Sequence, residues 1–71
     1  MSIIAEFIIK GEYITLSQFL KEENIISSGG QAKWYLQEHQ VLLNGEPEVR
    51  RGKKLHSGDK VEVAAETYEF H

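Results

Sequence analysis

The sequence of 71 residues contains no cysteine, one proline and one tryptophan. Without cysteine, disulfides and thiolate metal sites are excluded, and the composition suits a reducing compartment. No apolar run approaches the roughly 18 residues that span a bilayer. The first residues also lack the positive charge that opens a signal peptide. We therefore expect a cytoplasmic protein that does not associate with a membrane.

Patterns typical of enzymes and metal sites are also missing. The three histidines, His39, His56 and His71, are far apart and have no histidine or carboxylate four residues away, so a zinc site is not expected. No serine stands in a nucleophile elbow, and no glycine-rich loop leads into Lys-Ser or Lys-Thr. A chain this short buries only about 60% of its unfolded surface and has little room for a deep pocket. The sequence predicts one domain over residues 1–71 that is not an enzyme and that has no metal, cofactor or small-molecule substrate.

Positive charge is scarce overall but concentrated in one stretch. The net charge is −3, yet residues 50–60 carry five basic side chains and one acidic side chain, a local sum of +4. The other 60 residues carry three basic and ten acidic side chains, a sum of −7. Because salt screens charges over about 8–10 Å, the basic stretch can act nearly independently of distant acids. The sequence therefore predicts a polarised surface, one face of which attracts an anion.

The first third of the chain reads as a strand followed by a helix. Residues 3–9 are rich in isoleucine and phenylalanine and end at Lys10-Gly11, which predicts a strand and a turn. Thr15 and Gln18 stand three apart, as in a capping box that begins a helix. Asn24 can end that helix. Residues 64–71 are expected to extend the last strand or to pair with the first one, and to fray beyond Phe70.

A second helix and two hairpin turns are predicted over residues 27–63. Ser28 and Gln31 form a second capping-box pattern. The sequence Asn44-Gly45 predicts a type I′ turn, because both central positions of that turn need a positive φ. A turn at residues 57–59 then leads into residues 60–63, which alternate polar and apolar as a half-buried strand does.

The order helix, helix, "VLLNGEP", "RRGKKL", "SGDKVEV" resembles the small RNA-binding domain named after ribosomal protein S-four. The resemblance covers about residues 14–63, and "SGGQAKWYLQEHQ" is similar to the freestanding bacterial YaaA-type members. It implies an α+β fold in which a two-helix hairpin packs on a small, bent, mostly antiparallel sheet, with an added N-terminal strand. It also implies that RNA lies against the second helix and the basic loop. The expected partner is ribosomal RNA or a ribosomal subunit, bound by a monomer that acts as a ribosome-associated or ribosome-assembly factor.

The candidate RNA-binding residues lie at the second helix and in the basic loop: Ser28, Gly29, Gly30, Gln31, Lys33, Trp34, Arg50, Arg51, Lys53 and Lys54. The two glycines could leave backbone amides open to a phosphate, or could simply let the helices approach closely. Trp34 could stack on a base, although burial under a terminal strand is the interpretation we favour for a lone tryptophan. Two positions that often carry arginine in the family are Gly29 and Thr15 here, so more of the contact is expected from the basic loop.

A protein-interaction adaptor is the rival hypothesis. The acidic majority of the chain permits it, as do the exposed strand edges expected at both termini. Salt dependence separates the two hypotheses, because phosphate binding weakens steeply with added salt and an apolar protein interface does not.

Overall fold

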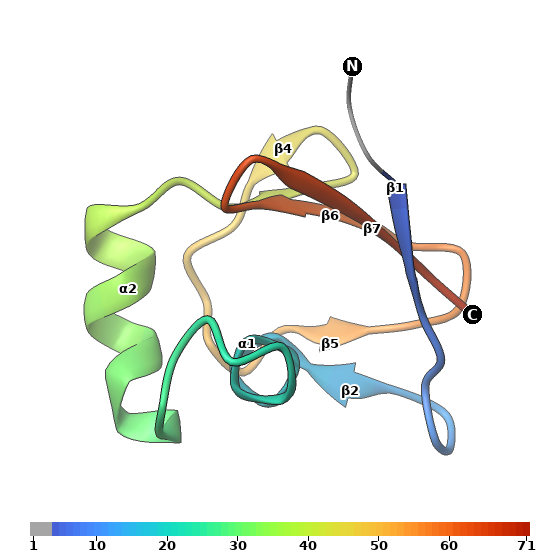
Figure 1. The fold of residues 1–71 in the computed structure, drawn as a ribbon, viewed down its shortest axis with the longest axis horizontal. Coiled ribbons are helices and arrows are strands. Elements are labelled where there is room, and N and C mark those ends of the chain that lie inside the picture. The colour runs from blue at the N-terminus through green and yellow to red at the C-terminus, as the bar shows by residue number, and fades with distance from the viewer. Residues whose placement is uncertain (1–3) are drawn as a thin grey trace.

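The computed structural model describes residues 4–71, so Ile3, the first residue of the predicted N-terminal strand, lies outside the described residues. The predicted fold class is confirmed: two helices combine with a small, mostly antiparallel sheet (Figure 1). The helices are α1 (Leu16–Glu22) and α2 (Ala32–Glu38), and a 3₁₀ turn, Gly29–Gln31, precedes α2. The strands are β1 (Ile4–Phe7), β2 (Ile14–Thr15), β3 (Leu42–Leu43), β4 (Glu46–Pro47), β5 (Lys54–Leu55), β6 (Lys60–Val63) and β7 (Glu66–Phe70).

Five strands form one sheet in the order β1-β7-β6-β3-β4, and β2 and β5 form a separate two-stranded ribbon. Every pairing is antiparallel except that of β1 with β7, which is parallel. The C-terminal strand thus pairs with both the N-terminal strand and β6. The expected fraying beyond Phe70 is wrong, because the His71 amide donates to the Phe7 carbonyl at 2.9 Å and the His71 carbonyl accepts from the Ile9 amide at 2.8 Å. Of the two terminal strands, β1 alone lies at a sheet edge.

The predicted capping box at the start of α1 is confirmed. The Thr15 hydroxyl accepts from the Gln18 amide at 3.3 Å, and the Gln18 side chain accepts from the Thr15 amide at 3.0 Å. Past the end of the helix, Asn24 adopts a positive φ of 57°, as a residue that terminates a helix often does. The buried face of α1 centres on Phe19, whose ring meets that of Phe70 at a centroid distance of 4.8 Å.

The two predicted turns are also present. Asn44 and Gly45 have φ values of 52° and 86°, and Gly58 has a φ of 96°. A third turn, between β6 and β7, uses Ala64 and Ala65 at φ values of 54° and 65°. Alanine rarely adopts this region, so that hairpin could not be predicted from these two residues.

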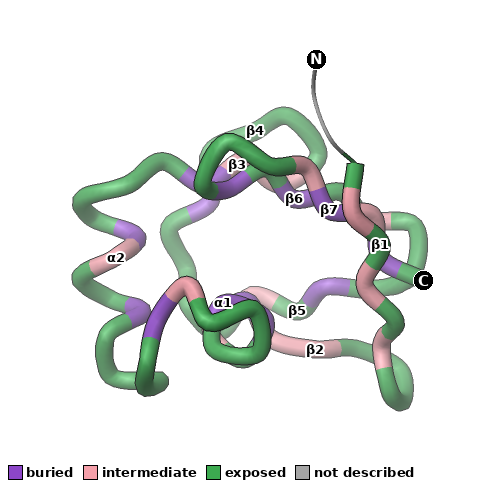
Figure 2. Tube along the Cα trace, viewed as in Figure 1, coloured by how far each residue is buried: buried purple, intermediate pink, exposed green. Residues whose placement is uncertain are grey.

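The core lies between the two helices and both sheets, as the buried segments in Figure 2 show. In Figure 1, α1 is seen end-on, with α2 on its left, the β2–β5 ribbon on its right and the five-stranded sheet above. The buried apolar side chains are Leu16, Phe19, Leu20, Ile26, Ala32, Leu36, Val41, Leu55, Val61, Val63, Tyr68 and Phe70. They come from every layer, so the ribbon and the basic stretch beside it are fixed to the same core.

Candidate nucleic-acid interface

The basic segment, defined as residues 50–54, connects β4 to β5 and is held against the start of α1. The Leu16 amide donates to the Lys53 carbonyl at 2.9 Å, and the Ser17 amide donates to the Arg51 carbonyl at 2.9 Å. Amides in the first turn of a helix have no partner inside the helix, so the segment supplies the acceptors that α1 needs. The backbone of the segment is therefore fixed, while its basic side chains remain wholly or partly exposed.

A groove of about 640 Å³ runs beside this segment, and we call it the basic groove. Its lining residues are Leu43, Asn44, Arg50, Gly52, Lys53, Lys54, His56 and Asp59. Three of the four cations predicted in the basic segment, Arg50, Lys53 and Lys54, line the groove, whereas Arg51 lies outside the lining. A shallow surface with three cations suits a chain of phosphates better than an enclosed small molecule.

The side of the groove away from the segment is built by two turns that are joined to each other. The Asn44 side chain accepts from the Lys60 amide at 2.9 Å and donates to the Asp59 carboxylate at 3.1 Å. The other carboxylate oxygen of Asp59 accepts from the His56 amide at 2.8 Å. From the sequence, Asn44 and Asp59 were expected only as residues of two separate turns. Their polar side chains were the one signal that the turns could meet.

Arg50 forms an ion pair with the buried carboxylate of Glu48, which was not among the predicted site residues. Glu48 is 8% exposed. One of its oxygens accepts from the Arg50 Nε at 3.1 Å, and the other accepts from the Arg50 Nη2 at 3.2 Å. The amides of Val49 and Arg50 also donate to Glu48, each at 3.1 Å. The hydrogen bonds from the Arg50 side chain are the main cause that holds the pKa of Glu48 below its usual range. Arg50 therefore reaches the groove with its charge partly balanced and two of its donors engaged.

The predicted capping box between Ser28 and Gln31 at the start of the second helix is wrong. The Ser28 side chain makes no capping hydrogen bond, and the Gln31 side chain instead accepts from the Ser27 amide at 2.8 Å and the Ser27 hydroxyl at 2.9 Å. The helix entry is a 3₁₀ turn, in which the Gln31 amide bonds to the Ser28 carbonyl. Ser27 offers the Gln31 side chain two donors, its amide and its hydroxyl, whereas the predicted capping box offered it one.

Gly29 and Gly30 are exposed, and a Cβ atom added at either would meet nothing within 4 Å. Close approach of the two helices therefore does not explain these glycines. Within residues 4–71, no hydrogen bond or ion pair links them to the basic segment. A phosphate shared by the start of α2 and the basic segment stays a prediction.

Lys33 and Trp34 both lie on the exposed face of α2. Trp34 is 63% exposed, so the interpretation that a terminal strand buries it is wrong. The reason is the sheet topology: β7 lies between β6 and β1, and its inward side chains pack around Phe19 of α1 instead. Trp34 is left as a flat apolar surface on the exposed face that also carries Lys33, and its stacking on a base stays a prediction.

Comparison of the sequence with known proteins identifies a family. Residues 7–70 match the family model of the S4 domain. The chain belongs to the S4 domain family. The S4 domain described here is also similar to the "Probable ribosome maturation protein RlbA" of Bacillus subtilis (strain 168). The two are 62% identical over 52 residues, which cover 73% of each chain. The predicted family resemblance is thereby confirmed.

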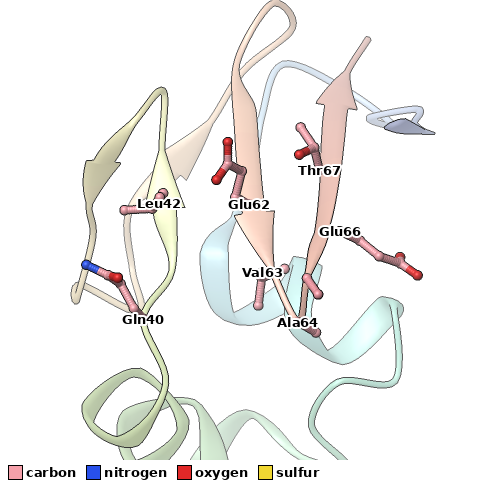
Figure 3. Close-up of a pocket in the computed structure, with 8 residues that line it drawn as sticks. Gln40, Leu42, Glu62, Val63, Ala64, Glu66 and Thr67 are labelled. Atoms are coloured by element: carbon pink, nitrogen blue, oxygen red, sulfur yellow. The ribbon is translucent and has the colours of Figure 1, made fainter. Parts of the chain in front are cut away.

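Another depression of this S4 domain has the opposite character. It measures about 350 Å³ and lies over strands β3, β6 and β7 (Figure 3). Figure 3 shows Glu62 and Thr67 side by side on β6 and β7, with Gln40 and Leu42 on the neighbouring segment. Its lining includes Glu62 and Glu66 and, within the described residues, no lysine or arginine. A polyanion is therefore favoured at the basic groove and disfavoured here.

A group of potential metal ligands also comes together, although the histidine spacing did not predict it. Glu6 and Glu69 are partners in the parallel register of β1 and β7, and His71 brings its ring within 4.8 Å of both carboxylates. The Lys60 ammonium lies 3.5 Å from Glu69, and His71 lies 3.9 Å from Glu6. The Lys60 ammonium pairs with one of these surface carboxylates, and we assign no metal to the cluster. In residues 4–71, neither helix is long and apolar enough to cross a bilayer.

Proposed function

We propose that this S4 domain binds folded RNA through the basic groove. The observation that carries the proposal is a fixed row of cations on a chain whose net charge is −3. Hydrogen bonds to α1 hold the backbone of the groove in place, so little backbone conformational entropy is lost when a phosphate binds. The major groove of an A-form helix is too narrow for side chains, so the contacts would be mainly with phosphates and 2′-hydroxyls.

The partner we propose is ribosomal RNA, in a ribosome or an assembling subunit. The supporting observation is the relative named as a ribosome maturation protein, at 62% identity. The role that fits is an assembly or maturation factor acting in the cytoplasm as a monomer. The candidate contacts on α2 would extend the surface beyond the groove: Ser28, Gly29, Gly30, Gln31, Lys33 and Trp34.

The proposed role is non-enzymatic. Within residues 4–71, no serine or threonine hydroxyl is hydrogen-bonded to an imidazole or a carboxylate, as an activated nucleophile would be. The surface depressions are also open rather than enclosed. RNA binding needs neither feature, because shape and charge suffice for it.

Replacing Lys53 and Lys54 by serine tests the groove. We expect the double variant to lose roughly ten- to a hundredfold in affinity for ribosomal RNA fragments and to stop co-sedimenting with ribosomal particles. Its fold should persist, because the segment is held by backbone carbonyls, and exposed substitutions cost within about 0.5 kcal/mol. Fluorescence anisotropy and gradient sedimentation measure the two effects.

The matched control replaces Lys21 and Lys60 by serine. It removes the same charge from positions outside the basic groove, so it should bind nearly as the parent does. Equal loss of binding in both double variants would mean that net charge matters and the groove does not. Parental binding by the Lys53/Lys54 variant would remove the groove from the account.

A protein-interaction adaptor is the alternative, and the edge of β1 favours it. β1 has a neighbour on one side only, and Ile4 and Ile8 beside that edge are 54% and 67% exposed. An extended peptide could add to this edge as a further strand. Such binding would change little with salt and would not depend on Lys53 or Lys54.

A further inference from the structure

The β2–β5 ribbon has one face turned to the core and one turned to solvent. In its antiparallel register Ile14 lies opposite Leu55. Leu55 is buried and Ile14 packs against the same core. Because side chains alternate between the two faces of a strand, the residues on either side of this pair point outward. The outer face therefore carries Tyr13, Lys54 and His56.

These three side chains are in contact across the ribbon. The Tyr13 and His56 rings lie at a centroid distance of 6.1 Å with an interplanar angle of 49°. The Lys54 ammonium lies 4.8 Å from the centroid of the Tyr13 ring. Tyr13 nevertheless remains 43% exposed. An ammonium over an exposed ring is held weakly, so it can move to a phosphate and leave the ring to another planar group.

Tyr13 stands between two surface depressions of different chemistry. Lys54 and His56 line the basic groove. Tyr13 itself lines a separate depression of about 370 Å³, together with Phe7, Ile8, Lys10, Ile14, Gln18 and Glu22. This volume falls in the range of small-ligand sites, about 300–1,000 Å³. Cations on one side, and on the other a hollow that combines the rings of Phe7 and Tyr13 with polar side chains, match the two ends of a nucleotide, its phosphate and its base.

We propose that Tyr13 stacks on one unpaired base of the bound RNA, while the phosphate of that nucleotide lies in the basic groove. The inference rests on the proposed function and adds the kind of RNA that is preferred. A base inside an A-form duplex is stacked on its neighbours and cannot reach the ring, whereas a bulged or looped base can. The preferred ligand is therefore a helix with an unpaired nucleotide, and Tyr13 is the residue that recognises it.

Two RNA hairpins that differ only by one bulged 2-aminopurine nucleotide test this inference. The parent should bind the bulged hairpin roughly five- to a hundredfold more tightly than the fully paired one. Tyr13→Leu should lose this preference and keep the affinity for the paired hairpin, and Tyr13→Phe should keep the preference. The 2-aminopurine fluorescence should be quenched by the parent and by Tyr13→Phe, but not by Tyr13→Leu.

The same comparison in a Trp34→Ala background removes the exposed aromatic side chain of the predicted site. Persistence of the preference and the quenching there would support Tyr13. Equal binding of the two hairpins by the parent would overturn the stacking role and leave the proposed function intact. A preference for the bulged hairpin that persists in Tyr13→Leu would also overturn the stacking role and leave the proposed function intact. If neither hairpin binds and the Lys53/Lys54 variant is indistinguishable from the parent, both the inference and the proposed function fail.

Discussion

At the scale of single residues, the charge of the basic groove depends on Glu48. The sequence places Arg50 in a stretch with a local sum of +4. In the fold, Glu48 is buried two positions earlier and engages both the backbone and the guanidinium of Arg50. The cations could be predicted from the sequence, but this pairing could not, because nothing local indicates that Glu48 is buried.

Glu48→Gln should therefore weaken the fold and strengthen RNA binding. Losing a buried, charge-assisted acceptor should cost about 1–3 kcal/mol of the free energy of unfolding. Freeing Arg50 should add about one phosphate contact and make the salt dependence of RNA binding steeper by about 0.9 in logarithmic slope. Calorimetry and anisotropy titrations measure the two effects. Weaker RNA binding by a folded variant would show that the ion pair is needed in the bound state.

The lowered pKa of Glu48 also predicts a dependence of stability on pH. A carboxyl group whose pKa is lower in the folded state stabilises the fold above its unfolded pKa and loses this contribution as the pH falls through its folded pKa. The parent should thus lose more stability on acidification below about pH 4.5 than Glu48→Gln does. Parallel stability curves for the two proteins in this range would contradict the assignment.

A substitution at Trp34 distinguishes a role in RNA binding from a role in packing. Because it is 63% exposed, Trp34→Ala should change the free energy of unfolding by less than about 0.5 kcal/mol. If the ring stacks on a base, the affinity for RNA should fall by about 1–3 kcal/mol. Unchanged affinity together with unchanged melting would mean that Trp34 has no part in the interface.

At the scale of elements, the fold was predictable wherever a short motif determines the local structure. The Thr15–Gln18 capping box and the Asn44-Gly45 turn both formed as expected. Prediction failed at the start of α2, where a 3₁₀ turn precedes the helix and the Gln31 side chain bonds to Ser27 instead of Ser28. It also could not find the hydrogen bonds from α1 to the basic segment, because their donors and acceptors are far apart in the sequence.

The β6–β7 turn offers a stability prediction of its own. Ala64 and Ala65 are held at positive φ, which costs an alanine roughly 1–2 kcal/mol relative to residues that tolerate this region. Ala64→Asn combined with Ala65→Gly supplies the preferred type I′ sequence. The melting temperature should rise by roughly 5–10 °C in calorimetry. Gly45→Ala in the β3–β4 turn is the reverse control and should lower it, and an unchanged melting temperature in the first variant would argue against this turn geometry.

At the scale of the whole molecule, the acidic net charge is compatible with binding RNA. The basic groove and the acidic depression over β3, β6 and β7, which Figure 3 shows, have no lining residue in common. Screening over about 8–10 Å lets each act on a ligand largely independently of the other. The acidic surface would disfavour nonspecific adsorption to RNA and so favour one orientation of binding.

The salt dependence of RNA affinity tests the central claim most directly. Each phosphate contact contributes about 0.9 to the slope of log affinity against log salt on a duplex. We predict a steep slope for the parent, a slope shallower by about 2 for the Lys53/Lys54 double variant, and the parental slope for the Lys21/Lys60 control. Equal slopes for the parent and the Lys53/Lys54 variant would contradict phosphate binding in the basic groove.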